Sequence, residues 1–477
     1  MLSLFIIAGT TLLASYFYTK LRYVRLTQYA HIPQLPPHRF WGHLKAFGEL
    51  TQRGIPDRHP DKIFEETWIS MGRPPLMLVD LRPGNAPMVL VPTHDIAEQI
   101  SKPTQLFPLS TTKSPTWTHT IPIIGESSIL GKEGDDWKDL RKKYNPGFTS
   151  QHLWRLLPLI IEKMGPFCDY LDRFSATEEE FSLEKLISNL TFDVIGAAVM
   201  EVDLQAQHMD RSKQSETIQQ KYAEVKEEAE GTRSRSILAL SFQDTGSLTP
   251  QLLSETSDQV RSFLFAGHDT NTGMLQWAFY ELSRTPRALK AVRSELDEVL
   301  GPETDPQVIC STLAERGQHL LPRITYINAV IKETLRLHPP ASTARITRPG
   351  SGFTVKTSTG EEYLMDGLIM YPCASIIQRD RNVFGDTADD WVPERWLGEA
   401  ADNIPPSAWR PFERGPRNCI GLELENLESR VIIAIVARKY DFVKTGLGES
   451  ALNANGLPIL NNKGQYRVHS ELYNKPG

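Results

Sequence analysis

Cys419 is the side chain whose setting in the sequence most directly indicates chemistry. It lies in the segment 412–421, Phe-Glu-Arg-Gly-Pro-Arg-Asn-Cys-Ile-Gly, which is rich in turn-forming residues and leads into a stretch with helical spacing of apolar residues. That spacing predicts a helix over 419–439 that begins at the cysteine. Unpaired N–H groups and the positive end of a helix dipole favour thiolate over thiol, and Arg417 adds a nearby positive charge.

A thiolate at this position can serve as a nucleophile or as a ligand of iron. A nucleophile needs a base within reach, and no histidine is near Cys419 in the sequence, so a base would have to come from a distant segment. An iron ligand needs backbone donors around the sulfur and small neighbours that let a flat macrocycle approach. Gly415 and Gly421 are such neighbours. The residues alone leave both chemistries open.

The other three cysteines, Cys168, Cys310 and Cys373, form no CxxC pair and no spacing typical of a zinc site or a disulfide framework. Each is expected to be a small buried apolar residue. The cysteine usage therefore favours a reducing compartment for the body of the protein.

Polar residues also interrupt the apolar spacing of the predicted helix 257–284. Asp269 and Thr270 lie in its middle, where threonine is a poor helix former and a buried aspartate is costly. A bond from the threonine hydroxyl back to the preceding turn is the structural alternative to a functional role. Helix propensity does not explain this pair.

Two further pairs have helical spacing. Glu333 and Arg336 are three residues apart, and Trp137 and Arg141 are four apart, so each pair shares one face of a predicted helix. A core tryptophan beside a solvated arginine is the alternative interpretation of the second pair.

Five residues of the cysteine segment match FxxGxRxCxG, so this segment resembles the heme-binding signature of the cytochrome P450 family. They are Phe412, Gly415, Arg417, Cys419 and Gly421. Four more motifs of that family stand in the expected order, and the resemblance covers nearly the whole chain. They are Trp137 with Arg141, Ala266-Gly267-His268-Asp269-Thr270, Glu333-Thr334-Leu335-Arg336 and Pro393-Glu394-Arg395-Trp396.

The resemblance implies a heme (iron protoporphyrin IX) cofactor with Cys419 as the axial ligand of its iron. Phe412 would shield the sulfur, Gly415 and Gly421 would allow a close turn, and the heme propionates would contact Arg417, Trp137 and Arg141. Thr270 and Asp269 would deliver protons to dioxygen, with Gly267 leaving room for it. Glu333, Arg336 and Arg395 would form a structural ion network behind the heme.

The composition and the spacing of apolar residues predict a mainly α protein with a small β region, which the resemblance makes a cytochrome P450 fold. The chain has 477 residues and a net charge of 52 − 58 = −6, which argues against a dedicated nucleic-acid binder. Helical spacing occurs over 183–200, 257–284, 287–300, 326–337 and 419–439, and strand-like pieces are 76–80, 87–91, 353–357 and 367–371.

The N-terminus predicts a single membrane anchor. Residues 1–19 carry no charge and are followed by Lys20, Arg22 and Arg25, which keeps the following chain in the cytoplasm. A cleaved signal peptide and a buried first helix are the alternatives. We expect an anchor with its basic stop over 1–25, a Pro-rich spacer over 26–40 and one catalytic domain over 41–477. The resemblance implies the endoplasmic reticulum membrane.

Two features depart from the family pattern. The interval between Ile195 and Ala266 is short, so the region near 203–235 supplies only one of the two expected lid helices. Glu425 stands where the family generally has a small residue, and the sequence offers no physical reason for it.

The expected function is therefore a membrane-bound monooxygenase that inserts one oxygen atom from dioxygen into a lipophilic small molecule, resembling fungal members of secondary metabolism. Electrons would come from NADPH-cytochrome P450 reductase, which Lys138, Lys142 and Lys143 could dock unless they form only a solvated face. The alternatives are a heme-thiolate isomerase or dehydratase, which the intact Asp269–Thr270 pair disfavours, and a degenerate member with a shortened lid.

Overall fold

The computed structural model describes residues 2–53, 58–208, 236–241 and 249–469, and most of the region expected to form a lid, 203–235, lies outside these ranges. The chain divides into two compact units. Unit 1 consists of Met1–Thr116, Ser342–Val383 and Pro406–Arg417, and unit 2 of Trp117–Ala341, Phe384–Pro405 and Asn418–Gly477. Helices dominate and strands are short, which confirms the predicted mainly α class.

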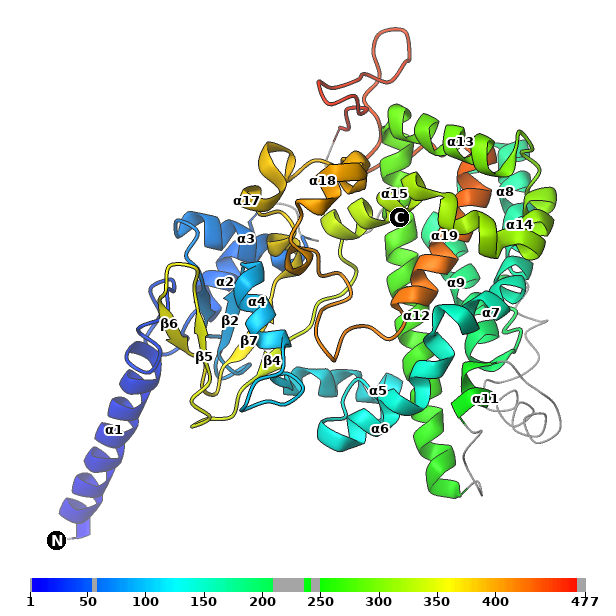
Figure 1. Ribbon diagram of the computed structural model, residues 1–477. Helices are drawn as coiled ribbons and strands as arrows, with labels where there is room; N and C mark the ends of the chain where they lie inside the picture. The colour runs from blue at the N-terminus through cyan, green and yellow to red at the C-terminus, as the bar shows by residue number, and fades with distance from the viewer. Residues whose placement is uncertain (1, 54–57, 209–235, 242–248, 470–477) are drawn as a thin grey trace. The chain divides into compact units, whose positions relative to one another are not determined.

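Unit 1 is built on a five-stranded sheet with the order β1-β2-β7-β4-β3 (Figure 1). Strands β2 and β7 are parallel, and the other neighbours are antiparallel. Strands β5 and β6 form a separate antiparallel pair. The strands are β1 (Met77–Val79), β2 (Met88–Val91), β3 (Thr112–Lys113), β4 (Arg345–Ile346), β5 (Thr354–Lys356), β6 (Glu362–Leu364) and β7 (Ile369–Pro372).

The four predicted strand segments match β1, β2, β5 and β7 to within two residues at each end. The sequence did not reveal β3, β4 and β6, which have only two or three residues each. The longer helices of unit 1 are α1 (Leu2–Leu26), α2 (Leu44–Thr51), α3 (Pro60–Ser70) and α4 (His94–Ser101).

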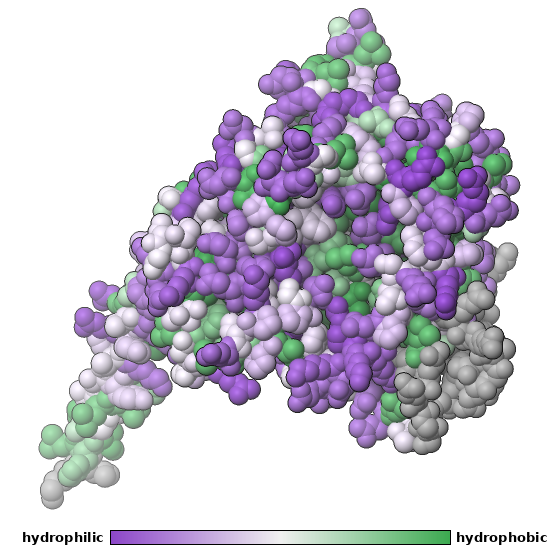
Figure 2. Space-filling model, viewed as in Figure 1, coloured by the Kyte–Doolittle hydropathy of each residue, from purple (hydrophilic) through white to green (hydrophobic). Residues whose placement is uncertain are grey.

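Helix α1 projects from unit 1 as a single rod with apolar residues at its free end (Figures 1 and 2). The segment Ser3–Leu26 is long and apolar enough to cross a membrane, and its apolar window is not buried in the protein. It therefore fits a membrane anchor, although a signal sequence has the same length and composition.

The last turn of α1 is attached to the sheet of unit 1. Arg25 is buried, forms an ion pair with Asp80 at 2.7 Å and donates to the carbonyl oxygens of Phe40 and Arg82. A side chain on Gly42 would place Cβ 2.6 Å from Arg25 Nη1, so this position requires glycine. Burial would raise the pKa of Asp80, but hydrogen bonds from Arg82 and Arg25 outweigh it and lower that pKa.

The Pro-rich segment that follows α1 also packs against unit 1. Ile32 is 1% exposed within the apolar core, and Pro33 accepts a 2.8 Å hydrogen bond from the backbone N–H of Leu78. This segment thus contributes to the core of unit 1.

Unit 2 is helical, and α12 is its longest helix (Figure 1). It packs against α9, α15 and α19. The helices are α5 (Ile121–Ile124), α6 (Gly134–Tyr144), α7 (Ser150–Glu162), α8 (Met164–Thr177), α9 (Leu183–Met200), α11 (Ile237–Ser241), α12 (Pro250–Arg284), α13 (Pro286–Leu300), α14 (Pro306–Leu320), α15 (Thr325–Leu337), α18 (Gly398–Asp402) and α19 (Leu422–Lys439).

Helix α12 starts seven residues before the predicted 257–284. Thr249 caps it by accepting from the N–H of Leu252, and Pro250 occupies its first turn, where a missing N–H costs nothing. The first turns carry mixed polar and apolar residues, which is why apolar spacing alone did not extend the prediction.

A buried ion network joins α15 to the segment around η6 (Pro393–Trp396) in unit 2. Arg336 donates to both oxygens of Glu333 at 2.8 Å, and neither side chain is exposed. Arg395 donates to Glu333 at 2.9 Å, and Trp396 donates to the other oxygen at 2.9 Å. The structure thus brings together the three residues expected to form a network.

The remaining donors of Arg336 bond to the backbone carbonyl oxygens of Ala388 and Asp390. Burial would raise the pKa of Glu333, but the hydrogen bonds and charges of Arg336 and Arg395 outweigh it and lower the pKa. Each buried charge is compensated, so the network depends on all of its members.

We predict that Glu333→Gln destabilises the protein by about 3–5 kcal/mol, because it leaves a buried arginine charge without its counter-ion. Urea titration measures the difference between this variant and wild type in the free energy of unfolding. That difference should have its full size at pH values above the ordinary pKa of a glutamate. It should shrink as the pH falls through the lowered pKa of Glu333.

Glu66→Gln is the matched control because Glu66 pairs with Arg58 while its own side chain is 53% exposed. It should have little effect. Equal effects of the two substitutions would contradict the assigned importance of the network.

Candidate functional site

The loop before Cys419 belongs to unit 1 and contains a glycine that its geometry requires. Gly415 has φ +76°, and a Cβ there would lie 2.2 Å from the carbonyl oxygen of Ser101. Any side chain would therefore clash with the backbone of α4. The expected close turn at this position is present.

Ion pairs attach the same loop to α4. Arg410 is buried and pairs with Glu98 at 3.1 Å and Glu413 at 2.6 Å, while Arg414 pairs with Glu98 at 2.9 Å. Ser101 donates to Glu413 at 2.8 Å. Sequence reasoning missed the contacts with α4 because they join residues more than 300 positions apart. The available signal was the density of arginine and glutamate over 410–417.

Two other residues of the expected signature are also in this part of unit 1. Phe412 contacts Trp409 edge to face, with ring centroids 5.9 Å apart. Arg417 is 8% exposed, so it is a buried residue and not a solvated surface one.

Cys419 and Gly421 belong to unit 2, where the sulfur lies just before a helix. Helix α19 begins at Leu422 with Gly421 as its N-cap, so the prediction that the helix begins at Cys419 is wrong by three residues. The backbone N–H groups of Gly421 and Leu422 bond to the sulfur, as expected of a thiol beside a helix N-terminus.

The pKa of Cys419 shifts in the direction opposite to the predicted one. Burial is the largest influence and raises the pKa of Cys419, while the two N–H bonds and the positive charge of Arg141 lower it. Helix-end donors therefore act in the predicted direction but do not outweigh burial. Arg141, four residues after Trp137, is a nearby cation whose charge lowers this pKa.

The surroundings of the sulfur fit an iron ligand. The Cys419 side chain is exposed even though protein atoms surround it densely enough to raise its pKa. A Cβ built on Gly421 would meet only the Cys419 sulfur, at 3.8 Å, so there is space directly beside it. A sulfur with two backbone donors and open space next to it suits the ligation of heme iron.

Arg141 also positions the residue before the cysteine. Its guanidinium donates to the backbone oxygen of Asn418 at 2.8 Å and to the side-chain oxygen of Asn418 at 3.1 Å. Trp137, one turn earlier on α6, is 6% exposed. The expected propionate contacts of these two residues remain predictions.

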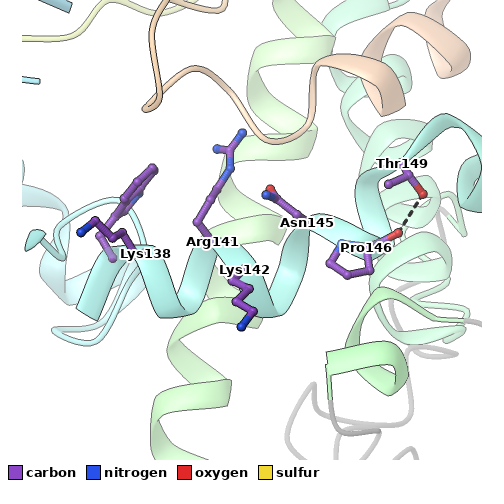
Figure 3. A pocket seen from close by; sticks show the side chains of 7 residues that line it. Lys138, Arg141, Lys142, Asn145, Pro146 and Thr149 are labelled. Atoms are coloured by element: carbon purple, nitrogen blue, oxygen red, sulfur yellow. Dashed lines mark hydrogen bonds between the residues drawn. The ribbon is translucent and has the colours of Figure 1, made fainter. Parts of the chain in front are cut away.

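The surface of α6 is hollowed beside Arg141. The hollow has a volume of about 580 Å³ and is lined by Trp137, Lys138, Arg141, Lys142, Asn145, Pro146 and Thr149. Figure 3 shows Arg141 and Lys142, which both line the hollow, pointing in opposite directions from α6. Lys138 pairs with Asp135 at 2.8 Å, and Lys143 does not line the hollow.

Residues 265–270 of α12 are half-buried or exposed, whereas the residues of the helix just before and just after them are buried. Asp269 is exposed, so it does not incur the burial cost expected from its apolar neighbours. The Thr270 hydroxyl donates to the carbonyl oxygen of Ala266 at 2.7 Å, which is the expected structural alternative. That bond occupies the hydroxyl hydrogen and leaves the oxygen able to accept.

Gly267 lies where α12 packs against α9. A Cβ there would lie 2.7 Å from two side-chain carbons of Ile195 on α9. The missing side chain allows α9 and α12 to pack closely, and the expectation that it also leaves room for oxygen stays a prediction.

The other cysteines fit the expectation of inert residues. Cys168 and Cys373 are buried and Cys310 is half-buried. Burial raises the pKa of Cys168 to about 12 and that of Cys310 to about 11. Within the described ranges, no three His, Cys, Asp or Glu side chains form a group that could hold a metal ion.

Comparison with known proteins gives one family. The sequence profile of the cytochrome P450 family matches residues 33–230 and 203–468. The cytochrome P450 monooxygenase polC of Polytolypa hystricis is 26% identical, over 91% of this chain and 87% of polC. The cytochrome P450 monooxygenase acrF of Aspergillus aculeatus is 28% identical, over 77% of this chain and 84% of acrF.

A second group of relatives matches a shorter part of the chain. The self-sufficient cytochrome P450 monooxygenase CYP505E3 of Aspergillus terreus is 36% identical over 39% of this chain, which is 16% of that protein. The profile match extends over most of the chain, and the two longer relatives align with most of their own length. This chain therefore belongs to the cytochrome P450 family of heme-thiolate monooxygenases.

Proposed function

We propose that this protein is a membrane-anchored monooxygenase of fungal secondary metabolism that inserts one oxygen atom into a lipophilic small molecule. The observation that carries this proposal is the accessible sulfur of Cys419 with open space beside Gly421. The names of polC and acrF and their fungal sources support the reaction type and the setting.

Heme bound through a cysteine thiolate supplies the activation of dioxygen. Cys419 would hold the iron, and the N–H groups of Gly421 and Leu422 would stabilise its negative charge. Arg417, Trp137 and Arg141 would bind the propionates. Phe412 would shield the sulfur and Gly415 would keep the loop close to α4.

Thr270 and Asp269, both on α12, would deliver protons to dioxygen. Because the Thr270 hydrogen is used by Ala266, its oxygen is suited to accept a hydrogen bond from a water molecule and hold it in place. The exposed carboxylate of Asp269 can exchange protons with solvent and pass them to that water. An intact pair of this kind favours oxygen insertion over the isomerase or dehydratase alternative.

Electrons would come from NADPH-cytochrome P450 reductase as a separate protein. The hollow on α6 supports this partner because Lys138 and Lys142 line it and could pair with acidic side chains of a flavoprotein. The self-sufficient relative CYP505E3 aligns over only 16% of its length, so any reductase function in the rest of that protein has no counterpart in this alignment.

The anchor would be α1, with the endoplasmic reticulum as the membrane and the catalytic part in the cytoplasm. Basic residues follow the apolar stretch, and Arg25 attaches the end of the helix to Asp80. The limits 1–25, 26–40 and 41–477 for anchor, spacer and catalytic domain are part of this proposal.

The ligand assignment predicts that the reduced protein gives the red-shifted carbon monoxide band of a thiolate-ligated heme, and that Cys419→Ala loses it. Cys310→Ala is the matched control, because Cys310 is half-buried on α14 and should leave the band unchanged. A band that survives in Cys419→Ala would show that another residue binds the iron.

Thr270→Ala should lower product formed per NADPH and raise the peroxide released, because the water held by its oxygen is lost. The assay uses added reductase and a lipophilic compound chosen because its binding shifts the heme spectrum. Thr256→Ala is the control, since Thr256 makes the same bond to the preceding turn but is buried. Unchanged coupling in Thr270→Ala would count against its role.

Removal of residues 1–19 should release most of the protein from membranes while the thermal midpoint of unfolding stays the same, because Arg25 and its ion pair are retained. Full-length Arg25→Ala should behave oppositely: it stays in the membrane fraction but unfolds at lower temperature. The anchor proposal fails if the truncated protein still sediments completely with membranes.

A further inference from the structure

Glu425, the acidic residue that the sequence left unexplained, lies on α19 one turn before Ser429. Ser429 is fully buried, and its hydroxyl oxygen lies 3.1 Å from Glu425 Oε1. The same oxygen lies 2.9 Å from Oδ1 of Asn271 on α12. Asn271 directly follows Thr270, so this chain of contacts joins α19 to the helix that carries the proposed proton pair.

The number of hydrogens that these three side chains can donate determines whether the Glu425 carboxyl group is ionised or neutral. Ser429 has one hydroxyl hydrogen, but it faces two acceptor oxygens if Glu425 is ionised. One of the two contacts therefore needs a hydrogen from the other partner. The amide oxygen of Asn271 has none to give, whereas a protonated Glu425 has one.

The orientation of Asn271 that this count assumes is the one in the structure. Its amide oxygen is the atom that lies 2.9 Å from the Ser429 hydroxyl oxygen, and its buried amide nitrogen has no hydrogen-bond partner among the described residues. Burial raises the pKa of the nearby Glu428 well above its usual range, and the Asn271 side chain opposes that rise.

The surroundings of Glu425 also favour a neutral carboxyl group. In the part of the chain that the structure describes, no lysine, arginine or histidine forms an ion pair with Glu425, and its Oε2 is buried without a hydrogen-bond partner. Burial raises the pKa of Glu425 to about 7, against the opposing influence of Ser429 and Arg430. An ionised carboxylate in this position would be poorly compensated.

We propose that Glu425 is a positioning residue that donates a hydrogen bond as a neutral carboxylic acid to Ser429, so that Ser429 in turn holds Asn271. The link fixes α12 next to Thr270 against the helix that follows Cys419. A small residue at position 425 would leave Ser429 with Asn271 alone, and the two helices would lose this polar connection.

The link itself stands on the contacts of Glu425, Ser429 and Asn271. Only its consequence for catalysis rests on the proposed function, through the roles of Thr270 and Cys419. Both tests below therefore use readouts that require no substrate and no turnover of the heme-loaded protein.

The first test measures the protonation state. The carboxylic-acid C=O stretching band in the infrared spectrum of the holoprotein near pH 6 should decrease in Glu425→Gln. Glu423→Gln is the matched control because Glu423 is an exposed acid on the first turn of the same helix, and it should leave the band unchanged. An unchanged band in Glu425→Gln would overturn the neutral state.

The second test measures the connection by hydrogen exchange of the peptide that spans residues 266–275. Glu425→Ala and Ser429→Ala should each accelerate amide exchange there by about fivefold, because one internal hydrogen bond is lost. Glu425→Gln should exchange as slowly as wild type, since its amide can still donate to Ser429.

The pattern across the variants separates positioning from general destabilisation. The double variant Glu425→Ala/Ser429→Ala should show no more exchange than either single variant, because both break the same link. Equal acceleration by Glu425→Gln and Glu425→Ala, or additive effects in the double variant, would overturn the proposal. Failure of the Thr270→Ala assay would leave these readouts unaffected and would count only against the proposed function.

Discussion

The structure depends on keeping one sulfur atom accessible while the backbone around it is held fixed. A cysteine that binds iron must have open space on one side and hydrogen-bond donors on the other. Cys419 meets both conditions because Gly421 leaves room beside the sulfur and the first N–H groups of α19 point to it. A cysteine in the middle of a helix would lack those donors, since its N–H groups would already be bonded.

Each unit stabilises its own share of the segment that leads to this sulfur. In unit 1, Arg410 and Gly415 hold the loop against α4, one by buried ion pairs and the other by the absence of a side chain. In unit 2, Arg141 fixes Asn418 through two hydrogen bonds. The Glu333 network stabilises α15, which packs against α12, the helix of Asp269 and Thr270, and against α19, the helix that follows Cys419.

The sequence was informative where chemistry or periodicity is local. The five-position motif around Cys419 and the pair Glu333–Arg336 could be identified because their members are close in the sequence. Long helices such as α9 were predicted to the residue because their apolar spacing is regular. The start of α19 was misplaced because glycine and cysteine at the turn carry no apolar signal that separates the turn from the helix.

What the sequence could not show depends on contacts between distant segments. The packing of Gly267 against Ile195 could not be predicted because Ile195 is on another helix. The attachment of α1 through Arg25 and Asp80 joins residues 55 positions apart, and the function inferred for Glu425 requires Asn271 from α12. Such pairs have no signature in one sequence because their spacing is set by the fold.

The central claim is that Cys419 provides the sulfur bound to heme iron, and X-ray absorption at the iron edge of the purified oxidised protein tests it most directly. The account predicts one sulfur among the nearest neighbours of iron in the wild type and in Cys310→Ala, and none in Cys419→Ala. A first shell made only of nitrogen and oxygen in the wild type, or a sulfur that persists in Cys419→Ala, would contradict it.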